Sequence, residues 1–218
     1  DASASYIAQV AMWITDHQLN LITAERFGST RPSIPLVKSA HIRQCNALRT
    51  DWASVLPPEQ CSFIVGNPPF VGKKEQSKEQ KADLEPLTGK LQGAGVLDYV
   101  TGWYFKAAAY MQANPAVRTA FVSTNSLFQG EQVAALWSLL LPLSARIHFA
   151  HRTFKWSNEG KGVAAVHCVI VGFALCDPTA PVRVFDYAQN IAGDGVESSA
   201  SRLNPYLVEG PDLLIDKR

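Results

Sequence analysis

The strongest constraint on the fold is a set of uninterrupted apolar runs that alternate with helical patterns. The runs CSFIVG (61–66), RTAFVST (118–124) and GVAAVHCVIVGFAL (162–175) are typical of strands buried on both faces. Buried strands that alternate with helices indicate an α/β sheet with helices on both faces. We therefore predict a mostly parallel sheet, in which a C-terminal hairpin supplies one antiparallel strand.

The remaining elements follow from periodicity and capping residues. Apolar positions in helical period predict a helix over about 1–22, and Asp98 can cap a helix of about fifteen residues. The segment 71–96 is polar and contains four glycines, so we expect it to be exposed and mobile, with part of it helical. The further elements predicted are a helix at 129–143, with Val133, Leu136, Trp137 and Leu140 on one face, and strands at 41–48, 145–154 and 182–188.

Composition limits the class of protein. A chain of 218 residues that is 47% hydrophobic suits one globular domain. The net charge of +1 excludes a global basic field, so a nucleic-acid partner would need locally concentrated positive charge or charge outside this chain. The four cysteines form no CxxC pair, which favours reduced, buried thiols over disulfides and predicts no metal site. With no apolar run of about 18 residues and no signal peptide, we expect a cytoplasmic protein without a membrane partner.

The chemistry is concentrated in the stretch FIVGNPPF (63–70). Ligands of open parallel sheets bind beyond the carboxyl ends of the strands, and Asn67 follows such a strand. The two prolines fix their own φ angles and keep Asn67 out of the helical region. The Asn67 carboxamide and the main-chain carbonyls beside it therefore project in fixed directions, and Phe70 offers a flat apolar face.

Such a turn suits an exocyclic amine on a planar ring. The lone pair of this amine is delocalised into the ring, which makes the nitrogen a poor nucleophile. Two acceptors placed on its two N–H bonds, here Asn67 Oδ1 and a main-chain carbonyl, favour a pyramidal nitrogen with a localised lone pair. Phe70 can stack on the ring. The alternative is that Pro-Pro simply ends the strand.

The wider sequence resembles the adenine-N6 DNA methyltransferase region of MmeI-like (type IIG and type IIL) single-chain restriction–modification enzymes and related phage-defence methyltransferases. The matching stretches cover nearly the whole chain in order: AMWITDHQLN (11–20), CNALRTDW (45–52), FIVGNPPFVGKKEQ (63–76), DYVTGWYFKAA (98–108), FVSTNSLFQGEQV (121–133), FAHRTFKWSNEGKGVAAVHCVIVGF (149–173) and LNPYLVEGPDLL (203–214). The resemblance implies a class I (Rossmann-like) methyltransferase fold, truncated at its N-terminus. It also implies S-adenosylmethionine as the cofactor, and double-stranded DNA with a flipped-out adenine as the substrate.

The resemblance also implies roles for individual residues. The catalytic motif would be Asn67, Pro68, Pro69 and Phe70. Cofactor contacts would come from Asn46 and Ala47, in the loop where the family meets the cofactor adenine, and from Asp1, near the acidic residue that grips the ribose. Substrate contacts would come from Phe154, Trp156, Arg152, Lys155 and Lys73. Alternatives stay open: Asn46 as a turn residue, RTFKWSN (152–158) as a solvated surface hairpin, Lys73 as a solvated lysine, and Asp98 as a helix cap rather than a ligand.

The chain departs from this family in one respect. No strand is followed by the Gly-rich loop that holds the methionine part of the cofactor, since GAG (93–95) and GDG (193–195) follow no strand. We therefore expect a piece of a longer protein, with a partial catalytic domain at 1–190 and a linker at 191–218. The parent would carry a separate DNA-recognition domain and possibly a nuclease domain, and this piece alone would bind the cofactor weakly or not at all. The rival hypotheses are an RNA or protein-glutamine methyltransferase and an inert scaffold.

Overall fold

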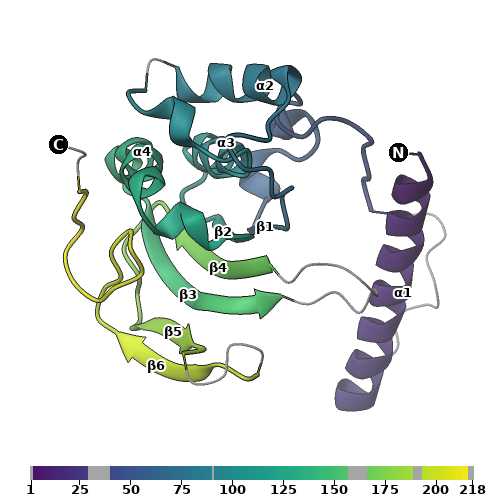
Figure 1. Cartoon of the computed structure of the whole chain (residues 1–218). Helices are drawn as coiled ribbons and strands as arrows, with labels where there is room; N and C mark the ends of the chain where they lie inside the picture. The colour runs from purple at the N-terminus through teal and green to yellow at the C-terminus, as the bar shows by residue number, and fades with distance from the viewer. Residues whose placement is uncertain (1, 29–39, 90, 157–165, 189–192, 216–218) are drawn as a thin grey trace. The chain divides into compact units, whose positions relative to one another are not determined.

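A computed structural model describes residues 2–28, 40–89, 91–156, 166–188 and 193–215 of the chain (Figure 1). The chain forms two compact units, Asp1–Val55 and Leu56–Arg218, which we describe separately. Among the described residues, no helix combines the length and the apolar character that crossing a membrane requires.

The first unit contains helix α1 (Ala2–Phe27) and the short 3-10 helix η1 (Trp52–Ser54). The helix predicted for the N-terminal segment is therefore confirmed. Its apolar side chains are exposed, including Ile7, Val10, Ile14 and Leu21.

The strand predicted at 41–48 is wrong, because the structure places a turn there. Asn46 Oδ1 accepts a hydrogen bond from Leu48 N at 2.9 Å, and Asn46 O accepts one from Thr50 N at 3.0 Å. A short amide side chain that bonds the nearby backbone competes with a strand ladder. No described strand pairs with this segment.

The second unit is built on a six-stranded sheet with the order β1-β2-β4-β3-β5-β6. The sheet includes the strands predicted near 61–66, 118–124, 145–154, 162–175 and 182–188. The strand bounds are β1 (Phe63–Gly66), β2 (Arg118–Thr124), β3 (Arg146–Trp156), β4 (Val166–Ala174), β5 (Val182–Asp186) and β6 (Val196–Ala200).

The strand directions make this a mixed sheet. β1 pairs with β2 in parallel, and β3 pairs with β5 in parallel, whereas β4 is antiparallel to both β2 and β3. The predicted hairpin of β3 and β4 is thus present. β6 is a second antiparallel strand, paired with β5, so a mostly parallel sheet with one antiparallel strand is not confirmed. The segment that forms β6, VESSA, carries too few apolar residues to be recognised as a strand.

The helices of this unit are α2 (Lys78–Thr88), α3 (Thr101–Met111) and α4 (Glu131–Leu140). Figure 1 shows α3 and α4 on one side of the sheet, with α2 beyond α3. Tyr104 of α3 stacks on Phe173 of β4, with ring centroids 5.6 Å apart, and meets Phe121 of β2 edge-on. The predicted apolar face of the 129–143 helix is confirmed, since Val133, Leu136, Trp137 and Leu140 are all buried. Short 3-10 helices complete the unit: η2 (Pro58–Gln60), η3 (Ala94–Val96), η4 (Asn125–Phe128) and η5 (Leu141–Leu143).

Two burial predictions are wrong in this unit. β1 was expected to be buried on both faces, but Phe63 is 69% exposed and Val65 77% exposed. The cause is position, since β1 is an edge strand and the described helices of this unit lie on one side of the sheet. The four cysteines are free thiols as expected, but Cys45 and Cys176 are exposed and only Cys168 is buried.

The segment 71–96 is more ordered than its composition indicates. Ser77 begins α2 with a capping box, in which its Oγ accepts from Gln80 N at 3.2 Å and its own N donates to Gln80 Oε1 at 2.9 Å. Asp83 is buried, and its carboxylate accepts a 2.6 Å hydrogen bond from Tyr99 Oη. The helical part expected in this segment is therefore α2, which packs on α3, while many residues of 71–96 are exposed as expected.

Candidate active site

The NPPF turn leaves the sheet at its carboxyl edge. Gly66, the last residue of β1, pairs in register with Phe121, and β2 continues for three more residues. Asn67 follows Gly66 directly. Because β1 and β2 are parallel, the turn and the segment after Thr124 leave the sheet at the same edge.

The four residues of the turn differ in exposure. Pro68 is buried and Phe70 half-buried, whereas Asn67 and Pro69 are exposed. Among the described residues, no hydrogen bond occupies the Asn67 carboxamide. An Asn67 carboxamide that was buried and hydrogen-bonded within the protein could not serve as the expected acceptor for a ligand amine. The observed carboxamide can reach a ligand.

The chain beyond the turn is fixed by the segment that precedes α3. Tyr99 N donates to Val71 O at 2.9 Å, and Lys73 N donates to Asp98 Oδ1 at 2.9 Å. Gln76 Nε2 donates to Leu97 O at 2.9 Å in a buried position. These bonds hold the outgoing end of the turn, while β1 holds the incoming end.

Asp98 is not the helix cap that its position suggested. Helix α3 begins at Thr101 with Val100 as its N-cap, and the Asp98 side chain points to other elements. Its Oδ2 accepts hydrogen bonds from Ser126 Oγ at 2.8 Å and from Gln132 Nε2 at 3.0 Å. The sequence reading missed Ser126 and Gln132. An available signal was the carboxylate inside the apolar run VLDYV, because a buried charge needs partners.

Lys73 lies close to the turn but is paired within the protein. Its Nζ forms a 2.5 Å ion pair with Glu131 Oε1, in the first turn of α4. Both side chains are partly exposed, at 35% and 27%. A phosphate would therefore have to compete with Glu131 for this lysine.

The aromatic residues predicted to contact substrate lie at the end of β3. A bulge between His151 and Phe154 changes the register of β3 against β4. Phe154 is half-buried against Tyr187, with ring centroids 5.2 Å apart, while Lys155 and Trp156 are exposed. β3 lies three positions from β1 in the sheet, which is about 14 Å in the direction across the strands. Gly66 is level with Ala150 in the register, so Phe154 lies about 10 Å further along the strands, and the cluster and the NPPF turn are well separated on the same edge.

Arg152 differs from its neighbours because its donors are occupied inside the protein. Nε and one terminal nitrogen donate to Leu207 O at 3.1 and 2.9 Å, and the other terminal nitrogen forms a 2.8 Å ion pair with Asp186. This guanidinium, together with the main-chain N of Ala188, lowers the pKa of Asp186. In this structure Arg152 anchors the C-terminal segment to the sheet.

The residues predicted to meet the cofactor lie in the first unit, apart from Asp1, which is outside the described residues. Asn46 Oδ1 is used by Leu48 N, and Ala47 O accepts from Trp52 Nε1 at 2.9 Å. Both groups thus already stabilise the turn after residue 45. A carboxamide oxygen has two lone pairs, so the bond from Leu48 N does not by itself exclude a contact with an adenine amine. Within the described residues no strand leads into a Gly-rich loop, since Gly93 and Gly130 precede short helices.

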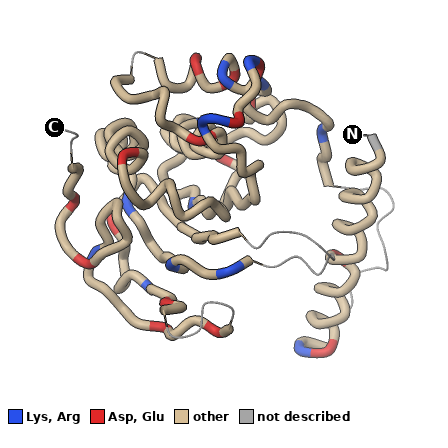
Figure 2. Tube along the Cα trace, in the orientation of Figure 1, with Lys and Arg blue, Asp and Glu red and all other residues tan. Residues whose placement is uncertain are grey.

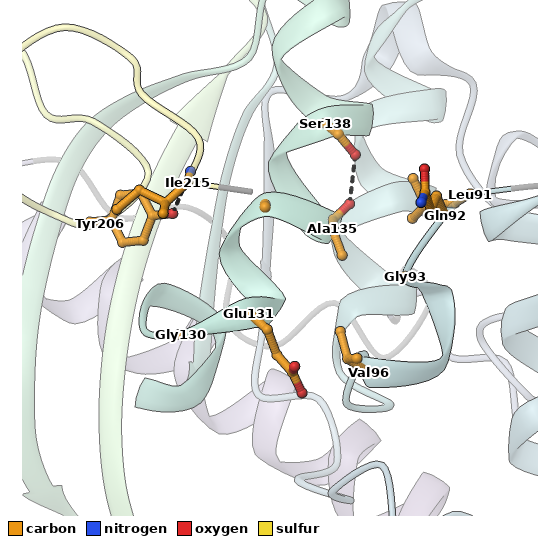
Figure 3. A pocket seen from close by; sticks show the side chains of 11 residues that line it. Leu91, Gln92, Gly93, Val96, Gly130, Glu131, Ala135, Ser138, Tyr206 and Ile215 are labelled. Carbon is orange, nitrogen blue, oxygen red and sulfur yellow. Dashed lines mark hydrogen bonds between the residues drawn. The ribbon is translucent and has the colours of Figure 1, made fainter. Parts of the chain in front are cut away.

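A large cavity lies beside α4, and no residue of the NPPF turn lines it (Figure 3). Its volume is about 880 Å³, and Figure 3 shows Ala135 and Ser138 of α4 on one side and Val96 of η3 on another. The lining also includes Glu131, the partner of Lys73. In Figure 2 the basic positions on nearby α2 alternate with acidic ones.

A second cavity of about 360 Å³ lies on the sheet near the start of β2 and β5. Its lining includes Arg118, His151 and Arg183. The His151 ring stacks on Phe185 with centroids 4.2 Å apart, and its Nδ1 is 2.7 Å from Tyr187 Oη. Burial, and then the positive charge of Arg183, lower the pKa of His151. In the described part of the chain, no cluster of three or more His, Cys, Asp or Glu could hold a metal ion.

Comparisons with known proteins agree on one family. The family described as MmeI, DNA-methyltransferase domain, matches residues 1–186. DNA methyltransferase A of Bacillus subtilis (strain 168) is 37% identical over 215 residues, which are 97% of this chain and 24% of that protein. The type IIL restriction-modification enzyme MmeI, solved in complex with DNA, is 50% identical with a TM-score of 0.91, and the match covers 100% of this chain and 29% of that one. The chain thus spans about a quarter of the length of these relatives.

Proposed function

Because the chain belongs to the MmeI DNA-methyltransferase domain family, we propose that it carries the catalytic half of an adenine-specific DNA methyltransferase. The reaction is transfer of a methyl group from S-adenosylmethionine to N6 of an adenine flipped out of duplex DNA. The observation that carries this proposal is the exposed Asn67 carboxamide at the carboxyl edge of the sheet, on a turn fixed by two prolines.

Asn67 acts on the amine of the target base. Its Oδ1 accepts one N–H, and a main-chain carbonyl of the turn accepts the other. These fixed acceptors favour a pyramidal nitrogen whose lone pair is available for attack, and they need no reorganisation at the moment of reaction. S-adenosylmethionine, when bound, supplies the electrophilic methyl group. No general base is required at the outset, since the proton can leave the nitrogen after transfer.

The other residues of the turn position the base. Phe70 stacks on the adenine ring and limits its rotation. Pro68 is buried and Pro69 fixes its own φ, so the acceptor geometry does not relax between turnovers. Trp156, Phe154 and Lys155 at the end of β3 are proposed to contact the flipped base or the adjacent backbone.

The remaining assignments are proposals as well. We retain the class I methyltransferase fold and the division into a partial catalytic domain (1–190) and a following segment (191–218). S-adenosylmethionine contacts at Asn46, Ala47 and Asp1, and DNA contacts at Lys73 and Arg152, are proposed. For Asn46, Ala47, Lys73 and Arg152 they require the residue to exchange or extend the bonds that it makes in this structure. The relatives are about four times longer than this chain. We therefore propose that activity, DNA-site recognition and any nuclease belong to a longer protein in the bacterial cytoplasm.

The test is the identity of the product. The complete protein should be incubated with isotopically labelled S-adenosylmethionine and, separately, with duplex DNA, RNA and protein. We expect label in DNA, and after digestion to nucleosides we expect it in N6-methyl-2′-deoxyadenosine. Label in cytosine would contradict the choice of base, and label in RNA or on protein glutamine would contradict the substrate class.

A further inference from the structure

We propose that Asp98 is the positioning residue of the catalytic turn, joining the chain that leaves NPPF to the end of β2 and the start of α4. This inference rests on the proposed function, because it assigns a role within the same site. Asp98 is only 7% exposed, and its carboxylate accepts three hydrogen bonds from three different segments.

The first of these bonds acts on the turn itself. Asp98 Oδ1 accepts from Lys73 N, three residues after Phe70, and Tyr99 N donates to Val71 O. If the Lys73 amide moves away, the buried carboxylate loses one of its hydrogen-bond donors, and an unsatisfied buried charge is energetically costly. The direction in which the chain leaves Phe70 is therefore fixed at Lys73.

The other bonds connect Asp98 to the remaining edge of the sheet. Ser126 Oγ, which donates to Asp98, is also 2.9 Å from Thr124 Oγ1 at the end of β2. Gln132 in the first turn of α4 bonds Asp98 in both directions, since its Nε2 donates to Oδ2 and its Oε1 accepts from Asp98 N at 2.9 Å. Movement of β2 or α4 would thus be transmitted to the turn through one carboxylate.

Because Asp98 and Gln132 bond each other, the carboxylate and the carboxamide can be exchanged between the two positions. This exchange tests whether the hydrogen bonds themselves matter for the reaction. In Asp98→Asn, the new NH₂ faces the NH₂ of Gln132, so that bond is lost while the side chain keeps its size. In Gln132→Glu, two carboxylates face each other. In the double variant Asp98→Asn with Gln132→Glu, the amide donates to the carboxylate, residue 98 N still has an acceptor, and Lys73 N still has Oδ1.

The experiment measures single-turnover DNA methylation in the complete protein, alongside DNA affinity and thermal unfolding. Displacing a catalytic group by about an ångström can slow a reaction roughly 100-fold, so we expect a loss of this order in each single variant with DNA affinity unchanged. The double variant should recover most of the rate. The matched control is Thr88→Val on α2, which removes a side-chain hydrogen bond at a position as buried as Asp98 (7% exposed) and should leave the rate unchanged.

A wild-type rate in folded Asp98→Asn, or no recovery in the double variant, would overturn the inference. If Asp98→Asn does not fold, Ser126→Ala removes a single donor and should give a smaller loss, again with DNA affinity unchanged. Hydrogen exchange at the Lys73 amide should also be faster in Ser126→Ala than in the wild type. An unchanged exchange rate at this amide would contradict the inference. Failure of the proposed function gives a different result, namely methylation that survives Asn67→Ala.

Discussion

Tyr104 of α3 and Ser123 of β2 share a 2.7 Å hydrogen bond between their hydroxyls at the centre of the core, where both side chains have zero exposure. Burial raises the pKa of Tyr104, so its hydroxyl stays protonated at any working pH. The bond joins α3 to β2, the strand that neighbours β1. It also satisfies two polar groups that water cannot reach.

Removing one hydroxyl should leave the other without its partner, so the effects of the two substitutions should not be additive. We expect Tyr104→Phe and Ser123→Ala each to lower the free energy of unfolding by about 1–3 kcal/mol, because each leaves one buried hydroxyl without a partner. The double variant should lose less than the sum of the two. Urea denaturation followed by circular dichroism measures all three, and strict additivity would mean that the two hydroxyls are not coupled.

Arg152 should hold the C-terminal segment in place. Leu207 adopts a left-handed backbone with φ of 58°, and its carbonyl accepts both Arg152 bonds. Arg152→Lys keeps the charge but loses the two-nitrogen geometry. We expect faster hydrogen exchange and faster proteolysis over 203–210 in this variant. Lys155→Arg serves as the control on the same strand, and equal protection in both variants would contradict the anchoring role.

Stability should fall when the solution is acidified from pH 7 towards pH 5. The pKa of His151 is lowered in the folded state by burial and by Arg183, whereas an unfolded imidazole titrates near about 6.5. The unfolded state therefore binds the proton first as the pH drops, which favours unfolding until the pH reaches the lowered folded value. The dependence should weaken in His151→Gln and persist in His167→Gln, whose histidine is exposed on β4. An identical pH profile in all three proteins would exclude His151 as the cause.

Elements with strong local patterns could be predicted from the sequence. The buried face of α4 follows from apolar residues at helical spacing, and the hairpin of β3 and β4 from two apolar runs with a short gap. The NPPF turn follows from the fixed φ of proline. In each case the signal lies in a few adjacent residues.

Features set by distant partners could not be predicted. Asp98 resembles a helix cap until Ser126 and Gln132 are placed beside it. Phe63 and Val65 look buried because a strand's own sequence does not tell whether it lies at the edge of a sheet. Residues 41–48 have a strand-like composition, but the Asn46 side chain bonds the local backbone instead.

The most direct test of the catalytic turn is the single-turnover methylation rate of Asn67→Ala in the complete protein, with folding and DNA affinity checked in parallel. Losing one preorganised partner of the developing charge typically slows a reaction by about 10²–10³-fold, so we predict a loss of at least this order while unfolding and DNA binding stay as in the wild type. A folded variant that binds DNA and methylates adenine at the wild-type rate would contradict the account.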